Sequence, residues 1–218
     1  MTSDLTSIEF AKNPAPRCPL VLVLDTSGSM AGEPIRELNA GLEALKTDLM
    51  SDPLAPTRVE IAIVTFGLND VQLVQDFVTV SEWVPPRLEA GGLTPMGGAL
   101  GLALDALFAR KATYKANGHQ YYRPWVFMLT DGNPTDDIQN AGSRIRQEEA
   151  SGGAAFFAVL VQGADEVAVR GLSSRPPIRL RGLAFRELFQ WLSASQRRVS
   201  ASQVGEQVAL PPVDWSTV

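Results

Sequence analysis

The chain has 218 residues, a formal net charge of −5 and an isoelectric point near 5.0. This length is sufficient for one well-buried α/β domain and short for two. The acidic balance argues against a general affinity for nucleic acids or anionic membranes, both of which attract basic surfaces. We therefore expect one domain with neither a nucleic-acid nor a membrane partner.

The cysteine content and the hydropathy indicate a reducing compartment. Cys18 is the only cysteine, so an internal disulfide is impossible, and the chain has no cluster of cysteine and histidine for zinc. The longest apolar run, 154–161, is too short to span a bilayer, and the first residues lack an apolar stretch of signal-peptide length. These features predict a cytoplasmic protein.

Apolar runs and helical patterns alternate along the chain. We predict an N-terminal arm over 1–17, a domain over 18–198 and a C-terminal tail over 199–218 that packs on the domain. Apolar runs predict strands at 20–24, 59–66, 71–80, 125–130, 154–161 and 178–180. Apolar residues spaced by three and four predict helices over 33–52, 99–111, 136–150, 165–172 and from 185 to about 198.

Two local signals refine this plan. The connection Gly67-Leu68-Asn69-Asp70 is too short for a parallel crossover, so the third strand is predicted to be antiparallel and at an edge. Thr135 or Asp136 is predicted to be the N-cap of the helix over 136–150. The expected fold is a doubly wound, Rossmann-like α/β domain, with a mainly parallel six-stranded sheet and helices on both faces.

Polar side chains gather directly after the first strand. The apolar run Leu20-Val21-Leu22-Val23-Leu24 suits a strand buried on both faces, and Asp25-Thr26-Ser27-Gly28-Ser29 follows it. Ligands of parallel sheets lie beyond the carboxyl ends of the strands. Asp25, Ser27 and Ser29 therefore offer three oxygen ligands to a hard cation.

Two later segments add oxygen atoms at the same edge. Asp131 follows the apolar strand over 125–130, and Thr94 lies in the loop Gly91-Gly92-Leu93-Thr94-Pro95-Met96-Gly97-Gly98 ahead of a helix. The complete candidate metal site contains two carboxylates and three hydroxyls, from Asp25, Ser27, Ser29, Thr94 and Asp131.

The motifs D-T-S-G-S, G-G-L-T-P-M-G and L-T-D-G resemble the metal-ion-dependent adhesion site of von Willebrand factor A domains, in the order typical of that family. The resemblance spans most of the chain and matches all five ligand positions. The T-P-M-G loop and the ending Leu210-Pro211-Pro212 are most similar to bacterial tellurite-resistance-associated, TerY-like proteins. That group implies a stress or phosphorylation signalling system containing a protein kinase and a metal-dependent phosphatase.

All-oxygen ligation with only two carboxylates favours Mg²⁺ over Ca²⁺, while Mn²⁺ and Ca²⁺ remain alternatives. Neutral hydroxyl ligands leave the ion electron-poor, so an open coordination position favours an Asp or Glu carboxylate from a partner protein. The resemblance implies the same binding mechanism. We therefore predict a metal-dependent protein-interaction module without catalysis.

An enzyme is the alternative. An apolar strand before Asp25 also resembles phosphatases with an aspartate nucleophile, which would use Asp25 for metal-dependent phosphoryl transfer. Those enzymes carry a second aspartate as general acid where this chain has Ser27, which cannot act as an acid at neutral pH. The glycine-rich loop at 91–98 lacks the Gly-Lys-Ser/Thr ending of a nucleotide-binding P-loop, so we assign its glycines to loop flexibility and helix packing.

Other reactive residues are assigned structural roles. His119, the only histidine, lies in a polar loop and is predicted to be a surface residue. Cys18, just before a buried strand, is predicted to be an inert packing residue. The arginines between 170 and 186 are predicted to form a solvated face.

Overall fold

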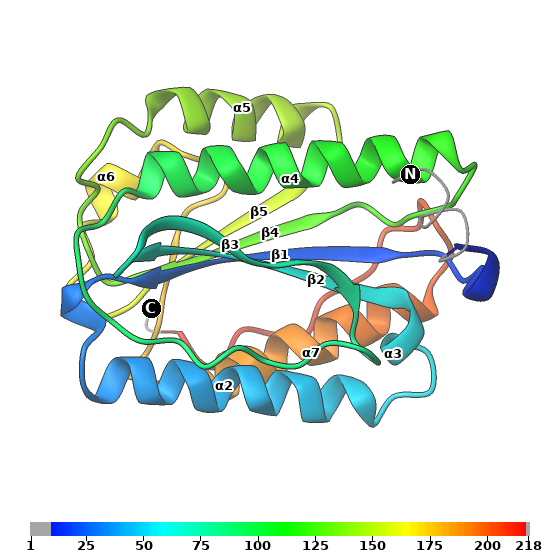
Figure 1. Cartoon of the computed structure of the whole chain (residues 1–218), viewed down its shortest axis with the longest axis horizontal. Helices are drawn as coiled ribbons and strands as arrows, with labels where there is room; N and C mark the ends of the chain where they lie inside the picture. Colours follow the sequence, from blue (N-terminus) through cyan, green and yellow to red (C-terminus); the bar gives the residue numbers. More distant parts are fainter. Residues whose placement is uncertain (1–9, 217–218) are drawn as a thin grey trace.

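A six-stranded sheet forms the middle layer of the structure, a computed structural model that describes residues 10–216 (Figure 1). The strands lie in the order β3-β2-β1-β4-β5-β6. Their bounds are β1 Cys18–Thr26, β2 Val59–Gly67, β3 Asp70–Thr79, β4 Trp125–Thr130, β5 Ala155–Leu160 and β6 Ile178–Arg179. β3 pairs antiparallel with β2, and the other neighbouring pairs are parallel. The predicted mainly parallel sheet with an antiparallel edge strand is confirmed.

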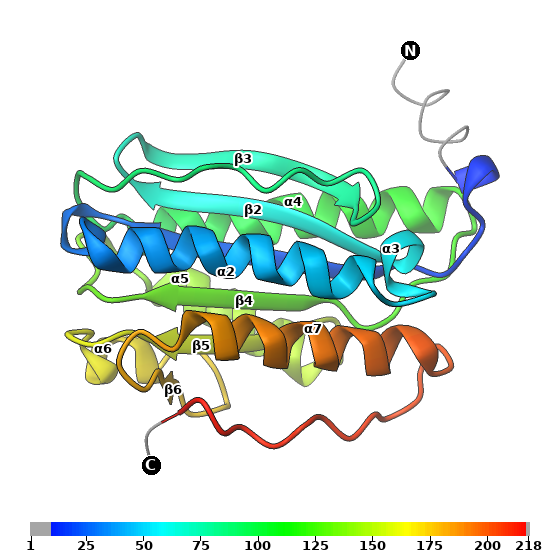
Figure 2. The ribbon, with the colours of Figure 1, turned by 90° about the horizontal axis from the view of Figure 1, so that it is seen from below.

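Helices cover both faces of this sheet. α4 and α5 lie on one face, and α2 and α7 lie side by side on the other (Figures 1 and 2). The helices are η1 Gly28–Met30, α2 Glu33–Met50, α3 Ala55–Arg58, α4 Met96–Ala116, α5 Gln139–Ala150, α6 Glu166–Arg170 and α7 Phe185–Ala201. Among the helices of residues 10–216, none combines the length and the apolar character needed to cross a bilayer.

The central strand β1 explains the two apolar layers. Leu20, Leu22 and Leu24 belong to the core shared with α2 and α7. Val21 and Val23 point to the opposite face and belong to the core shared with α4 and α5. Because alternate side chains of a strand point to opposite faces, a strand buried on both sides must be apolar throughout. This requirement accounts for the uninterrupted apolar run.

The start of α5 differs from the prediction. This helix begins at Gln139, and the side chain of Asp136 instead accepts hydrogen bonds at 2.8 Å from the backbone nitrogens of Gly97 and Gly98 in the first turn of α4. The prediction that Thr135 or Asp136 caps α5 is therefore wrong. Asp136 joins the start of α4 to the loop after β4, and α4 itself extends beyond the predicted 99–111 at both ends.

Residues near the two ends of the chain pack on the domain. Phe10 is buried, and its ring stacks on His119 with 4.4 Å between centroids. His119 is half-buried, so this predicted surface residue is less exposed than its polar sequence neighbours suggest. Trp215 is fully buried, and its carbonyl accepts a hydrogen bond from the backbone of Arg181. Residues 1–9 of the predicted arm and 217–218 of the predicted tail lie outside the described residues.

Candidate metal centre

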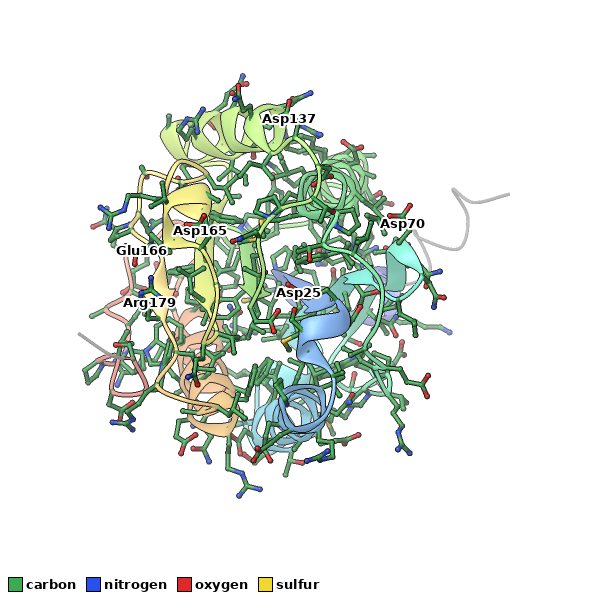
Figure 3. The ribbon with its side chains drawn as sticks, turned by 90° about the vertical axis from the view of Figure 1, so that its left-hand side faces the viewer. Asp25, Asp70, Asp137, Asp165, Glu166 and Arg179 are labelled. Atoms are coloured by element: carbon green, nitrogen blue, oxygen red, sulfur yellow. The ribbon has the colours of Figure 1, made fainter. Side chains whose placement is uncertain are left out.

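The candidate centre lies where the strand order reverses direction. β1 has β2 on one side and β4 on the other, and the register pairs Leu24 of β1 with Leu129 of β4. Asp25 and Asp131 therefore emerge from adjacent parallel strands at their carboxyl ends, the edge that faces the viewer in Figure 3. Doubly wound sheets bind their ligands at this switch point.

Asp25 is fully buried and held at both carboxylate oxygens. Its Oδ1 accepts a hydrogen bond from the backbone nitrogen of Ser27 at 2.8 Å. Its Oδ2 accepts a hydrogen bond from Thr130 Oγ1 at 2.5 Å. These contacts, one local and one from the neighbouring strand, fix the orientation of the carboxylate.

A chain of hydroxyls connects the first loop to the second carboxylate. Ser27 Oγ and Ser29 Oγ are 3.1 Å apart, and Ser29 Oγ donates to Asp131 Oδ1 at 2.7 Å. Ser27 is buried, whereas Ser29 is exposed. The oxygen atoms of this loop therefore extend from the interior to the surface.

Thr94 approaches the same group of oxygens from the loop before α4. A Cβ atom added to Gly132 would lie 3.2 Å from Thr94 Oγ1 and 3.7 Å from Asp25 Oδ2. The Thr94 carbonyl accepts hydrogen bonds from the backbone nitrogens of Met96 at 2.7 Å and Thr135 at 2.9 Å. The structure thus brings all five predicted side chains to one edge of the sheet.

The glycines of this loop allow a close approach of the backbone. Gly91 N donates to Thr26 O at 2.8 Å, and Gly28 N donates to Gly92 O at 3.1 Å. Gly92 has a φ of +75°, and a Cβ there would lie 2.3 Å from Gly67 O. A larger residue would collide with the end of β2. The glycine pair therefore fixes the loop against the first motif, a role beyond the flexibility assigned from the sequence.

Burial dominates the electrostatics of the two carboxylates. Desolvation raises the pKa of Asp25 above its usual value, against four weaker hydrogen-bond contributions that lower it. Desolvation also raises the pKa of Asp131, and the neighbouring charge of Asp25 raises it further. Within residues 10–216, no lysine or arginine forms an ion pair with either carboxylate. A cation at this position would relieve both the desolvation and the repulsion.

The donor set fits a hard divalent cation. The described part of the chain contains no group of three or more His, Cys, Asp or Glu side chains in metal-binding proximity. A metal here would instead depend on two carboxylates supplemented by hydroxyls, together with water or a ligand from another molecule. Oxygen-only ligation with few charges is the chemistry that Mg²⁺ accepts in proteins.

Thr130 is the threonine of the L-T-D-G motif, and the sequence analysis assigned it no role in the site. It is fully buried, it donates to Asp25, and its Oγ1 also accepts a hydrogen bond from Gly132 N at 3.2 Å. The signal that could have identified Thr130 was the register between β1 and β4. This register places Thr130, the last residue of β4, beside Asp25 of β1. That register is not encoded locally.

The remaining reactive residues have structural environments. Cys18 is buried, and burial raises the pKa of its thiol strongly, which disfavours the reactive thiolate. Arg175 forms an ion pair with Glu149 at 2.5 Å, and Arg179 forms one with Glu166 at 2.9 Å. Much of the charge on the arginine-rich stretch is thus balanced within the chain.

Comparison with known families agrees with this geometry. The family model for the von Willebrand factor type A domain matches residues 20–187, which is most of the chain. The chain belongs to this family. The matched range includes all three loops of the candidate centre. Comparison with curated proteins finds no match.

Solved structures of three other proteins share the fold at low sequence identity. Proximal thread matrix protein 1 of the mussel byssus is 16% identical, with a TM-score of 0.58 over 86% of this chain and 47% of its own. The pilus adhesin SpaC of Lactobacillus rhamnosus GG is 15% identical, with a TM-score of 0.61 over 84% of this chain and 30% of its own. Manganese-loaded TRAP protein of Plasmodium vivax is 20% identical, with a TM-score of 0.51 over 73% of this chain and 64% of its own. This chain thus spans half or less of the first two proteins.

Proposed function

We propose that this von Willebrand factor A domain binds a protein partner through a divalent cation, with Mg²⁺ as the expected ion. Asp25, Ser27, Ser29, Thr94 and Asp131 would hold the ion directly or through water, and an Asp or Glu carboxylate of the partner would complete its coordination. The observation that carries the proposal is the fully buried Asp25 beside Asp131, without an ion-pair partner for either among residues 10–216.

Two metal-containing structures with a similar fold support the proposal. One structure of the mussel protein has zinc in its MIDAS motif, and the TRAP structure is manganese-loaded. The preference for Mg²⁺ in this chain rests on its own donors, which are all oxygen atoms and include only two carboxylates.

The proposed role is binding without catalysis. Ser27 occupies the position where a phosphatase of the aspartate-nucleophile class needs a general acid, and its hydroxyl lies 3.1 Å from that of Ser29. A serine hydroxyl does not supply a proton at neutral pH. We expect no metal-dependent hydrolysis of phosphoesters or nucleotides. Turnover that disappears in Asp25→Asn would favour the enzyme instead.

The wider biological role is proposed from the motif resemblance. The T-P-M-G loop and the Leu210-Pro211-Pro212 segment support a place in a bacterial tellurite-resistance-type stress response or phosphorylation system, with a kinase or phosphatase as partner. The single, buried Cys18 supports a cytoplasmic location.

A thermal-shift experiment tests the centre directly. Mg²⁺ or Mn²⁺ is expected to raise the melting temperature of the wild-type chain, because a ligand that binds only the folded state stabilises it. Asp25→Ala should abolish this rise. Asp76→Asn, which neutralises an exposed aspartate on β3, is the matched control and should retain it. An unchanged rise in Asp25→Ala would refute the assignment.

The Thr94 loop provides a second test. Because Thr94 comes from a different segment than Asp25, Ser27 and Ser29, we propose that it contributes more to partner binding than to metal binding by the free domain. Calorimetry of Thr94→Ala should show a larger loss of affinity for a glutamate-containing peptide in Mg²⁺ than for Mg²⁺ alone. Equal losses would make Thr94 an ordinary ligand of the free domain.

A further inference from the structure

Acidic side chains lie on three sides of the candidate metal centre. In Figure 3, Asp25 lies near the middle, with Asp137 above it, Asp70 to its right, and Asp165, Glu166 and Arg179 to its left. The surrounding acidic residues come from separate places: the β2–β3 hairpin, the loop before α5, and the start of α6. We call Asp70, Asp137 and Asp165 the acidic rim.

Two of the three rim residues, Asp70 and Asp137, carry negative charge that no ion pair balances in the part of the chain that the structure describes. Asp137 accepts a hydrogen bond from the backbone of Gln139 at 2.9 Å, and Asp165 accepts one from Val167 at 2.8 Å. Backbone donors bring no full positive charge. In the described part of the chain, no ion pair reaches the acidic rim. At the start of α6, Arg170 and Arg179 both contact the Glu166 carboxylate beside Asp165, so two positive charges offset the two negative ones there.

The metal centre and the acidic rim favour opposite charges on a ligand. A bound dication balances the two charges of Asp25 and Asp131, so the outer face remains negative. The ion attracts a carboxylate at contact distance, whereas the rim repels negative charge over roughly 8–10 Å at physiological salt. A ligand that meets both demands has a single carboxylate with positive charges on either side.

Exposed apolar side chains lie next to residues of this face. Leu93 is 71% exposed directly before Thr94, and Val167 is 84% exposed directly after Glu166. Leu68, in the hairpin before Asp70, is 45% exposed. A protein segment crossing the centre would cover these side chains, whereas a small carboxylate would leave them in water.

We propose that this face selects a protein segment in which one Asp or Glu is flanked by Lys or Arg, an inference that rests on the proposed contact between the metal and a partner carboxylate. An acidic segment would supply the carboxylate but would be repelled by the rim. Pairing of this face with the same face of a second copy would bring two acidic rims together. Charge complementarity therefore favours the basic-flanked segment.

Short peptides test this selection. The first has a central glutamate between pairs of lysines, the second has the same glutamate between pairs of aspartates, and the third has glutamine between pairs of lysines. In Mg²⁺ at low salt, the lysine-flanked glutamate peptide should bind about tenfold or more tightly than the aspartate-flanked one, because complementary charges are weakly screened. Added salt should narrow this difference, and chelator should abolish binding.

Neutralising the rim should remove the selection without removing the metal. The triple variant Asp70→Asn, Asp137→Asn, Asp165→Asn preserves the local acceptors, and asparagine tolerates the φ of +63° at residue 70. The ratio of its affinities for the two glutamate peptides should approach one, and its Mg²⁺-induced rise in melting temperature should persist. Glu43→Gln, Glu82→Gln, Glu206→Gln removes three charges from exposed residues outside this rim and should retain the preference.

The outcomes separate the two proposals. Metal-dependent binding of both glutamate peptides with equal affinity, or an equal loss of preference in the control variant, would overturn the selection alone. Equal binding of the glutamate and glutamine peptides, or binding that survives chelation, would overturn the metal–carboxylate contact and the selection with it. Failure of the lysine-flanked glutamate peptide to bind would also overturn the selection.

Discussion

Buried carboxylates lie at both ends of the sheet, but only one end provides their counterions. At the amino end of β2, Glu60 is fully buried and contacts Arg17 and Arg110, each at 2.7 Å, and the hydroxyl of Tyr114. At the carboxyl end of β1, Asp25 is equally buried and contacts a hydroxyl and a backbone nitrogen.

The difference separates a structural charge from a functional one. A buried charge is tolerated when its partners are built into the fold, as they are for Glu60. Asp25 and Asp131 lack such partners within residues 10–216, and burial raises the pKa of both. The pair must be neutralised by protons or by a cation from outside the chain, which is the physical reason to expect metal at this end of the sheet and none at the other.

The largest expected effect is at the Glu60 end. Glu60→Gln would leave the fully buried guanidinium of Arg17 without its carboxylate, and breaking a buried ion pair in this way costs about 3–5 kcal/mol. Urea unfolding should show this loss with and without Mg²⁺. Glu82→Gln, at an exposed residue, should change stability by less than about 0.5 kcal/mol. A similarly small change in Glu60→Gln would show that the network contributes little.

The same type of substitution at Asp25 should not lower the free energy of unfolding when metal is absent. Asp25→Asn removes a charge that burial disfavours, so unfolding in chelator should show equal or greater stability than wild type. With Mg²⁺ at about 100 times its Kd, the wild type should gain about 2.7 kcal/mol and the variant nothing. A large loss of stability for Asp25→Asn in chelator would contradict the contrast between the two ends.

Competition between protons and Mg²⁺ for the two carboxylates should reveal the raised pKa values of Asp25 and Asp131. In metal-free protein, the contribution of Asp25 and Asp131 to stability is fully present below the ordinary aspartate pKa of about 3.9, and it is lost as pH rises through the higher folded values. Mg²⁺ requires the deprotonated pair, so its stabilisation should show the reverse dependence. The Mg²⁺-induced rise in melting temperature should be full near neutral pH and decline before ordinary aspartates protonate. A constant rise down to about pH 4 would be inconsistent with the raised values.

Local patterns were sufficient to predict most strands and the five candidate ligands. The apolar run before Asp25 requires burial on both faces, and the short loop from Gly67 to Asp70 excludes a parallel crossover. Both features depend only on residues that are neighbours in the sequence, so they can be predicted from the sequence alone. The predicted edge strand and the sheet direction followed from them.

Contacts between distant segments were not predictable in this way. Glu60 meets Arg17 and Arg110 across separations of 43 and 50 residues, and nothing near Glu60 marks it as buried. The local pattern predicts Thr135 or Asp136 as the cap of the helix that follows, although the carboxylate of Asp136 accepts from the backbone of α4, which precedes it in the chain. Such pairings depend on how complete elements pack.

Thr130 provides the smallest and most selective test of the comparison, because its neutral hydroxyl contacts Asp25 where arginines contact Glu60. Thr130→Val preserves shape but removes the donor to Asp25 Oδ2, so the carboxylate should lose its orientation and Mg²⁺ affinity should fall about tenfold. Thr26→Val is the matched control, since the buried Thr26 hydroxyl donates to Phe66 O at 3.1 Å rather than to a carboxylate. In chelator, Thr26→Val should lose about 1 kcal/mol of stability, and Thr130→Val about 1.5–3 kcal/mol, because its acceptor is a carboxylate. Calorimetry with Mg²⁺ should then separate them, and equal Mg²⁺ affinities for the two variants would show that Thr130 supports the fold without orienting Asp25.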